Sequence, residues 1–449
     1  MNIKLPKNVL NIITTFEKEK FEIYVVGGAV RDILMKKMVF DWDFTTNATP
    51  KQILQLFPDA FYTNEFGTVG LPPENEGERP YEITTFRTEH GYSDTRRPDK
   101  VKWGKTLEED LKRRDFTINA LALAKAKSKY KLVDLFDGQK DLEEKLIRAV
   151  GNPNERFSED ALRMMRAVRI ATELNFMIEK KTLSAIKKNK QLIHKISKER
   201  IKDELTKILA SEHPFEGMTL FRETGLSKEI LPELENTFGV EQKSPGRHHI
   251  YDVGTHGMLS LKNCPSTDPI VRFATLVHDI GKPQTRKVLK NGTVTFYNHE
   301  LVSAKIAKNI AARLRFSKKE AEKFWRLVRF HQFTVDEKQT DSAIRRFIKK
   351  VSPELVPDML DLRVGDRLGG GARETSWRLE EFKKRIVEVQ KQPFAVRDLK
   401  ITGTDVMKEL KLKPSPKIGE ILQNLYDEVV EKKLDNSKKS LLLRLGGMK

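Results

Sequence analysis

Cysteine is nearly absent from this chain. Its 449 residues include one, Cys264, which excludes both an internal disulfide framework and a zinc site built from several cysteines. No stretch approaches the roughly 18 to 20 apolar residues of a membrane span. The first twenty residues mix acidic and basic side chains where a secretory signal would carry an apolar run. We therefore expect a cytoplasmic protein that does not enter a membrane.

Acidic residues are fewer than basic ones. The chain has 64 Asp and Glu against 83 Lys and Arg, a formal net charge of +19. A surplus of this size indicates a polyanionic partner, of which nucleic acid is the commonest, although a solvated basic surface is the alternative. The length exceeds that of one ordinary hydrophobic core and predicts two to four domains.

The pattern of apolar residues predicts a multidomain α+β protein. Residues 1–145 mix strand-like runs with helices, and 146–240, 245–375 and 376–449 read as helical. Most of the histidines fall in 245–375, and the last region is basic. The predicted strands are FEIYVVGG (21–28), VFDWDFTT (39–46), FGTVGLP (66–72), YEITTFR (81–87) and KYKLVDLF (129–136).

A glycine pair joins the first predicted strand to a helix. In YVVGGAVRD, Gly27 and Gly28 would let backbone N–H groups approach a phosphate, and Arg31 could add a cationic contact. A simple tight turn is the alternative for this short pattern, which lacks the spacing of a dinucleotide fingerprint.

Two aspartates in VFDWDFTT are the first candidates for catalysis. Side chains alternate along a strand, so Phe40, Trp42 and Phe44 should face the core while Asp41 and Asp43 face the other side together. Such carboxylates repel each other unless a cation lies between them. Oxygen ligands of this kind suit Mg²⁺, which also takes phosphate oxygens of a substrate.

A third carboxylate, Glu82 in YEITTFR, is a candidate for the same site or else a charge on an edge strand. Metal ions held by paired carboxylates promote in-line phosphoryl or nucleotidyl transfer: one activates the attacking hydroxyl and another stabilises the leaving group. An exposed polar strand face is the alternative for the whole set.

Five strings in the first half of the chain resemble the class II CCA-adding enzymes and bacterial poly(A) polymerases of the nucleotidyltransferase superfamily. They occur in the family's order and together are highly specific. They are GGAVRD (27–32), the Asp41–Asp43 pair, RRDFTINALA (113–122), EDALRMMRAVR (159–169) and ISKERIKDEL (196–205).

The resemblance implies a role for each motif. Asp41 and Asp43 would hold Mg²⁺, with Glu82 as a further catalytic carboxylate. The other residues would bind the nucleotide: Gly27, Gly28 and Arg31 its triphosphate, Arg114 and Asp115 the region of its sugar, and Asp160 and Arg163 the base edge of CTP or ATP. Asp160 and Arg163 would be neighbours on one helix, with Arg166 near phosphate and Arg169 structural.

The family also has a flexible loop, matched here by residues 87–103, which is linked to the switch from C to A addition. Arg96, Arg97 and Pro98 resemble its usual form, so A addition is expected. The insertion PPENEGERP (72–80) departs from the family's compact hairpin and is interpreted as a longer surface turn.

A second constellation lies in the histidine-rich half. His278–Asp279 should sit on a helix that begins at Asp268–Pro269 and ends at Gly281. Dispersed histidines and aspartates can converge on a divalent transition metal. The pattern resembles the HD phosphohydrolase domain, which implies His256, His278, Asp279 and Asp366 as first ligands. His299 and His331 could serve a second metal.

The resemblance therefore implies four domains: a nucleotidyltransferase head (1–145), a helical neck and body for nucleotide recognition and RNA binding (146–240), an HD domain (245–375) and a helical tRNA-binding tail (376–449). The implied partners are tRNA, CTP and ATP. Three alternatives stay open: a poly(A) polymerase or A-only enzyme on the same motifs, an HD phosphohydrolase acting on RNA ends, and a non-enzymatic RNA-binding protein.

Overall fold

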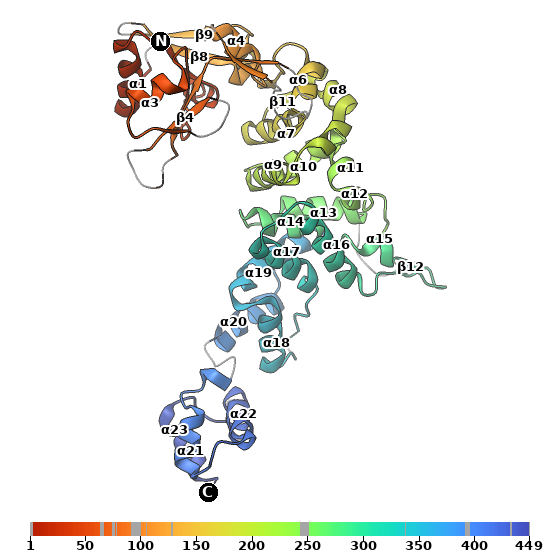
Figure 1. Cartoon of the computed structure of the whole chain (residues 1–449). Helices are drawn as coiled ribbons and strands as arrows, with labels where there is room; N and C mark the ends of the chain where they lie inside the picture. Colours follow the sequence, from red (N-terminus) through yellow and green to blue (C-terminus); the bar gives the residue numbers. More distant parts are fainter. Residues whose placement is uncertain are drawn as a thin grey trace. The chain divides into compact units, whose positions relative to one another are not determined.

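The computed structural model describes residues 3–62, 67–73, 77, 79–90, 100–104, 106–126, 129–242, 251–336, 338–390, 396–431 and 433–448. These residues form two compact units (Figure 1). The first unit comprises Met1–Asn236 and Ile310–Phe316, and the second comprises Thr237–Asn309 and Ser317–Lys449. The first contains a mixed sheet followed by helices and the second is mainly helical, so the multidomain α+β prediction is confirmed.

The first unit is built on a seven-stranded sheet in the order β3-β4-β5-β2-β1-β8-β9. Strands β2 and β5 are parallel, and the other neighbouring pairs are antiparallel. The strands are β1 (Ile23–Val26), β2 (Asp43–Thr46), β3 (Phe61–Tyr62), β4 (Thr68–Leu71), β5 (Tyr81–Thr85), β8 (Leu121–Ala126) and β9 (Lys129–Asp134). A separate hairpin pairs β6 (Arg87–His90) with β7 (Lys100–Trp103).

Short helices pack on this sheet. Helix α1 (Lys7–Lys18) buries Val9, Ile12, Ile13 and Phe16, a spacing that places all four on one face. This face joins sheet residues such as Phe44 and Ile83 in one hydrophobic core. The remaining helices of this part are α2 (Gly28–Leu34), α3 (Pro50–Leu56), α4 (Leu107–Lys112) and α5 (Gly138–Glu143).

The strand predicted over residues 39–46 begins only at Asp43. Val26 pairs with Asp43 at the end of β1, and the chain then turns at Gly27, so the residues before Asp43 have no partner in β1. Phe40 is consequently 75% exposed, and the prediction that it faces the core was wrong. Trp42 packs at the edge of the core and Phe44 is fully buried.

The helical part of the first unit follows the sheet. Two short parallel strands, β10 (Leu146–Ile147) and β11 (Met177–Ile178), connect its helices. The helices are α6 (Pro153–Glu159), α7 (Leu162–Leu174), α8 (Lys180–Asn189), α9 (Lys198–Ala210), α10 (Pro214–Glu223), α11 (Leu226–Ile230) and α12 (Pro232–Glu235). The motif at 159–169 is therefore not one helix, because the chain leaves helical geometry at Asp160.

The second unit contains two groups of helices. The first is α13 (Val253–Lys262), α14 (Pro269–Val277), α15 (Lys282–Thr285), α16 (His299–Arg313, of which the residues from Ile310 belong to the first unit), α17 (Lys318–Phe330), α18 (Asp341–Val351), α19 (Val356–Gly369) and α20 (Trp377–Gln390), with a hairpin of β12 (Lys287–Val288) and β13 (Val294–Thr295). The second is α21 (Gly403–Leu410), α22 (Pro416–Val430) and α23 (Lys438–Gly446), which share their own apolar core. Across the described ranges, every helix is too short or too polar to span a bilayer.

Candidate active sites

Three carboxylates gather at one end of the sheet in the first unit. Asp43 begins β2 and is paired in register with Glu82 on β5. Burial raises the pKa of Asp43 to about 6, and the negative charges of Asp41 and Glu82 add to this effect against the opposing charge of Arg114. Burial and Asp41 also raise the pKa of Glu82. A divalent cation would relieve this repulsion, so the donor set fits one.

Asp41 lies in the loop before β2, and its carboxylate is half exposed. Its Oδ2 accepts a hydrogen bond from Arg79 Nη1 at 2.9 Å. Arg79 belongs to the insertion at 72–80, which we interpreted as a surface turn, and no sequence signal assigned it to this site. Both side chains are well exposed, so solvent screens the pair and a cation can compete for the carboxylate.

The glycine turn lies directly against the carboxylates. Gly27 has a φ of +73°, and a Cβ atom there would come within 2.9 Å of Arg114 Nη1 and 3.4 Å of Asp43 Oδ2. Glycine is required both by this left-handed backbone and by the close approach. The first residue of α2 is Gly28. Arg31 donates to Asn119 Oδ1 at 2.9 Å and to Asp32, so it is held beside the RRDFTIN motif.

The RRDFTIN motif forms a buried ion-pair network. Arg114 lies 3.3 Å from Asp110. Asp115 accepts hydrogen bonds from Arg166 Nε at 2.8 Å and from the backbone N–H of Phe116. Although burial alone would raise the pKa of Asp115, Arg166 lowers it to about 2. Arg166, expected near phosphate, is thus committed to Asp115.

Asp160 and Arg163 are not adjacent on one helix as predicted, because Asp160 lies in the break between α6 and α7. One oxygen of Asp160 accepts from the N–H of Leu162 at 3.0 Å, and the other accepts from Arg200 Nη2 at 2.8 Å. Arg163 donates to Glu159 at 2.6 Å and to a backbone carbonyl. The two side chains are fixed by different partners, and Arg200 was not predicted.

Arg169 of the same motif binds Glu204 and Glu173, at 2.6 Å and 2.7 Å. These contacts agree with the structural role expected for it. Arg96, Arg97 and Pro98 lie outside the described residues.

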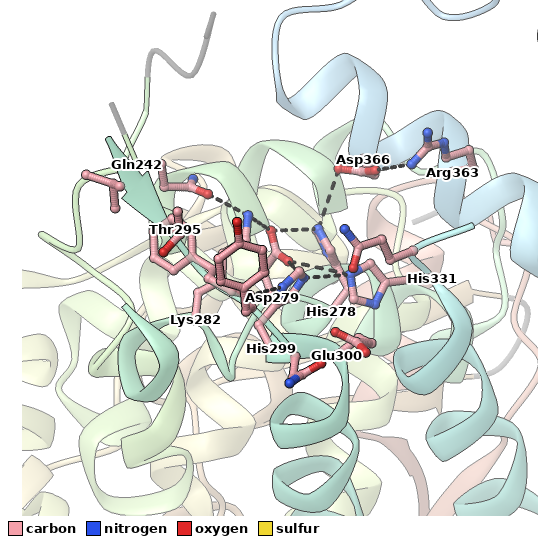
Figure 2. Close-up of a pocket in the computed structure, with 15 residues that line it drawn as sticks. Gln242, His278, Asp279, Lys282, Thr295, His299, Glu300, His331, Arg363 and Asp366 are labelled. Atoms are coloured by element: carbon pink, nitrogen blue, oxygen red, sulfur yellow. Dashed lines mark hydrogen bonds and ion pairs between the residues drawn. The ribbon is translucent and has the colours of Figure 1, made fainter. Parts of the chain in front are cut away.

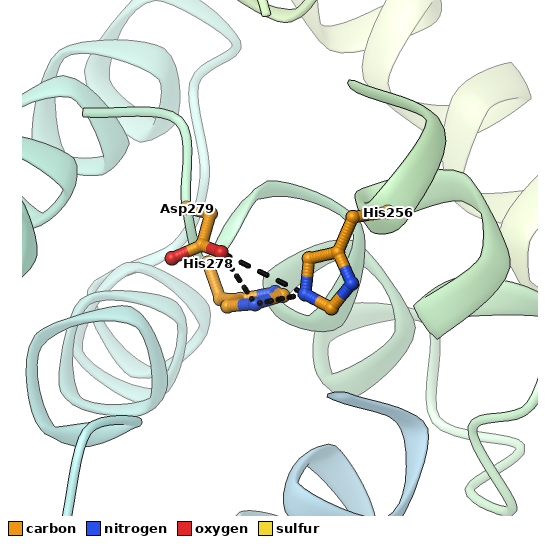
Figure 3. Close-up of side chains that lie close together, drawn as sticks. All are labelled: His256, His278 and Asp279. Carbon is orange, nitrogen blue, oxygen red and sulfur yellow. Dashed lines mark hydrogen bonds and ion pairs between the residues drawn. The ribbon is translucent and has the colours of Figure 1, made fainter. Parts of the chain in front are cut away.

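The second unit brings all six predicted histidine and aspartate ligands together. His256 comes from α13 and Asp366 from α19, while His278 and Asp279 directly follow α14. The predicted helix over 268–281 ends at Val277, because the chain turns there toward Gly281. His256 Nε2 lies 3.2 Å from His278 Nε2 and 3.2 Å from Asp366 Oδ1 (Figure 3 shows the histidine pair).

Asp279 connects two groups of donor atoms. The ligand atoms of His256, His278 and Asp279 lie within 4.8 Å of one another, as do those of Asp279, His299 and His331. Asp279 Oδ2 lies 3.2 Å from His278 Nε2, and Oδ1 lies 3.2 Å from His299 Nε2. Each oxygen of this carboxylate thus faces a different group, so the geometry suits two metal ions sharing it.

The backbone orients three of the histidines. Nδ1 of His278, His299 and His331 each lies 2.7 to 2.9 Å from the carbonyl oxygen three residues earlier. Because a carbonyl only accepts, Nδ1 carries a proton, so Nε2 is the nitrogen that faces the cluster and that would bind a metal ion in the neutral ring. Burial alone would lower the pKa of His278, but Asp279 and Asp366 raise it to about 10, which reflects a strongly cation-attracting site.

All members of this cluster except His256 line a cavity of about 460 Å³ (Figure 2). Lys282 also lines it, lying 2.6 Å from Asp279 Oδ2 and 2.6 Å from Gln242 Oε1. Arg363 lies 3.1 Å from Asp366. These three neighbours were not predicted: Lys282 and Arg363 lie three residues from Asp279 and Asp366 but were assigned no role, and Gln242 stands apart from any motif.

Comparison with known proteins finds four regions of the chain that match family models. Family models match as follows: “Poly A polymerase head domain” at residues 23–148, “Probable RNA and SrmB-binding site of polymerase A” at 175–238, the HD domain at 248–366 and tRNA nucleotidyltransferase domain 2 at 371–444.

Two curated relatives illustrate the range of similarity. The CCA-adding enzyme of Pediococcus pentosaceus is 34% identical over 432 residues, which cover 96% of this chain and 95% of that protein. The CCA-adding enzyme of Ligilactobacillus salivarius is 51% identical over 223 residues, 49% of this chain. In that alignment the chain spans about half, 54%, of the relative's length.

Solved structures of CCA-adding enzymes are also similar to this chain. The Bacillus stearothermophilus CCA-adding enzyme in complex with CTP is 25% identical, with a TM-score of 0.70 over 98% of this chain and 96% of that one. The Thermotoga maritima CCA-adding enzyme complexed with tRNA has a TM-score of 0.60 over 99% and 97% of the two chains. At 18% identity, that likeness shows the fold alone.

Proposed function

The chain belongs to the CCA-adding enzyme family, and from this premise we propose that it adds or repairs the CCA 3′ end of tRNA without a template. CTP and ATP are the donors, the tRNA 3′-hydroxyl is the nucleophile and pyrophosphate leaves. The observation that carries this proposal is the coupled set of carboxylates Asp41, Asp43 and Glu82 beside the Gly27 turn.

Asp41 and Asp43 would hold Mg²⁺, with Glu82 beside them. The ion would supply charge neutralisation at the reacting phosphate and at the attacking hydroxyl. The residues of the chain supply position: Gly27 leaves room for a phosphate at the carboxylates, and Arg114 and Arg31 offer positive charge nearby. Because these groups are held by Asp110 and Asn119 before substrate arrives, little reorganisation is needed during transfer.

Base selection would fall to Asp160 and Arg163. A carboxylate accepts from an amino group and a guanidinium donates to a ring nitrogen or carbonyl, so together they can read one base edge. The contacts of Asp160 with Leu162 N–H and Arg200 support this role, because they fix the direction of its carboxylate.

A nucleotide-by-nucleotide extension assay tests the proposal. Pure protein is incubated with tRNA ending before CCA, with tRNA ending in C or CC, and with each nucleoside triphosphate alone and in pairs. We expect CTP to extend the first two substrates and ATP to add one A after CC. Long tracts made from ATP alone would instead indicate the poly(A) polymerase alternative.

We propose a second activity, metal-dependent hydrolysis of phosphoesters at RNA ends, for the histidine–aspartate cluster. The specific observation is that Asp279 is shared by two groups of donor atoms. Imidazole nitrogens with carboxylates suit a divalent transition metal such as Mn²⁺, Co²⁺ or Ni²⁺. Bound metal would supply an activated water, while Lys282 and Arg363 offer positive charge to a phosphate.

Metal analysis tests the shared-ligand arrangement. His331 contributes to one group only, whereas Asp279 contributes to both. Elemental analysis after dialysis should therefore show about two metal ions in the wild type, about one in His331→Ala and almost none in Asp279→Asn. Equal metal content in the two variants would contradict a shared carboxylate.

A further inference from the structure

One wall of the cavity in the second unit carries an exposed aromatic side chain that no proposed step uses. Tyr297 lines the same cavity as His278 and Asp279 and is 74% exposed. It lies two residues before His299, one of the candidate metal ligands, so the Cα atoms of the two residues are within roughly 7 Å of each other. Among the described residues, no hydrogen bond, ion pair or ring contact engages it. Its ring is thus available to a ligand.

The surroundings of Tyr297 differ from an ordinary exposed aromatic. The adjacent Asn298 has a φ of +60°, a left-handed conformation that asparagine adopts more readily than most residues. Asn298 and Gln332 also line the cavity, and their side-chain amides can both donate and accept hydrogen bonds. An aromatic face with two amides is suited to a planar, polar, hydrogen-bonding group.

The same cavity offers a place for phosphate. Lys282 and Arg363 line it together with the metal-ligand candidates, and Lys282 is held in position by Asp279 and Gln242. A volume of about 460 Å³ falls within the range of small-ligand pockets. The combination of cationic, aromatic and amide groups therefore matches a molecule that carries both a phosphate and a planar heterocycle.

We propose that Tyr297 is a stacking platform for the nucleobase of a nucleoside phosphate whose phosphate lies at the histidine–aspartate cluster. This inference rests on the phosphoesterase function proposed above and adds its specificity: the site takes phosphate esters of nucleosides in preference to base-free sugar phosphates. A free nucleotide and the phosphorylated end of an RNA share this chemistry.

Calorimetric binding to the full chain tests the platform without requiring turnover. The probes are the 2′-, 3′- and 5′-monophosphates of adenosine, ribose 5-phosphate and a short RNA with a 3′-phosphate, each with and without Mn²⁺. The variants are Tyr297→Ala, Tyr297→Phe and, as a matched control, Tyr62→Ala, which removes an exposed tyrosine of the first unit. Each variant is compared with wild type for the same probe. Nucleotide that binds in the first unit contributes equally to both measurements, because that binding does not depend on Tyr297.

Loss of base stacking should weaken binding of the tightest adenosine monophosphate roughly 5- to 150-fold in Tyr297→Ala. Tyr297→Phe keeps an aromatic face and should bind within about twofold of wild type, as should Tyr62→Ala. In wild type, ribose 5-phosphate should bind more weakly than adenosine 5′-monophosphate by a similar factor. Tighter binding of the RNA than of any mononucleotide would identify an RNA end as the source.

Equal binding by wild type and Tyr297→Ala, with unchanged metal content, would overturn the platform. So would equal affinity for the base-free and base-containing phosphates, a measurement that needs no variant. The two proposals can fail separately. Tyr297-dependent binding without hydrolysis removes the phosphoesterase, whereas equal hydrolysis of base-free esters removes the platform and leaves the phosphoesterase.

Discussion

Asp43 shows how a residue proposed for catalysis can be poorly suited to the stability of the fold. Its carboxylate is largely buried beside two others, which raises its pKa from 3.8 to about 6. The charged form therefore lowers the stability of the metal-free protein at neutral pH. We predict that Asp43→Asn raises the free energy of unfolding by about 1 to 2 kcal/mol at pH 8 without Mg²⁺, after discounting for partial solvent access. The variant should be inactive in nucleotide addition.

The direction in which the stability of the wild type changes with pH provides the control for this prediction. Because the folded-state pKa exceeds the unfolded value, the folded protein binds a proton more readily between pH 4 and pH 6. Wild type should gain stability on acidification through this window, relative to Asp43→Asn, and the two should converge below it. Thermal unfolding of both proteins and of Asp59→Asn, an exposed control in the same unit, measures this. A difference that is independent of pH would contradict the assignment.

At the scale of elements, the break between α6 and α7 positions Asp160, the carboxylate that we propose for base reading. Asp160 accepts a hydrogen bond from the N–H of Leu162, the first residue of α7, and forms an ion pair with Arg200 of α9. Arg200→Ala should free the carboxylate to rotate. Because a hydrogen bond to a charged group contributes about 1.5 to 3 kcal/mol, we predict roughly a tenfold loss or more in the preference for CTP over UTP. The KM for tRNA should change little.

Steady-state kinetics with each triphosphate measures this discrimination as a ratio of kcat/KM values. Arg200→Lys keeps the charge and should retain part of the preference, while Arg315→Ala removes an exposed arginine of the same unit and should retain all of it. An unchanged CTP-to-UTP ratio in Arg200→Ala would exclude a positioning role for the pair.

The same helix break shows what sequence patterns predict and what they miss. The regular apolar spacing of EDALRMMRAVR predicted a helix, and most of it is one. The break at Asp160 was missed because an aspartate just before the next helix looks the same in sequence as one on a helix surface. Strand β8 was also missed: half of LALAKA is alanine, which has weak strand propensity. Pairing with β1 and β9 overrides that preference.

The candidate sites show the same limit: side chains inside a recognisable motif were predicted, and the neighbours that contact them were missed. The six histidine and aspartate candidates were predicted from the resemblance to the HD domain, which rests on the adjacent His278–Asp279 pair with further histidines before and after it. Arg79 and Gln242 reach their sites from segments without any motif, and Lys282, three residues after Asp279, was assigned no role. Their contribution depends on tertiary contacts between common residue types, which spacing in one sequence does not encode.

For the molecule as a whole, the net charge of +19 should govern encounter with tRNA. Each phosphate contacted by Lys or Arg releases condensed counterions, so affinity falls steeply with salt. We predict that the Kd for tRNA rises by roughly two to four orders of magnitude between about 50 and 200 mM NaCl. Filter binding measures this, with the KM for CTP as the comparison. A flat response would remove the electrostatic argument for tRNA binding.

The two candidate active sites lie in separate units, each built from side chains of one unit alone. Their chemistry should therefore be separable by single substitutions. Asp43→Asn should lower nucleotide addition by about a thousandfold or more, through loss of a metal ligand, and leave phosphoester hydrolysis within about twofold. His278→Ala should lower phosphoester hydrolysis and leave nucleotide addition intact, because it removes a candidate ligand from the histidine–aspartate cluster without changing the carboxylates of the sheet.

Both activities are measured on the same preparations, with metal content and thermal unfolding to establish folding. If His278→Ala also abolished addition while remaining folded, the two sites would be coupled and independent function of the units would be excluded.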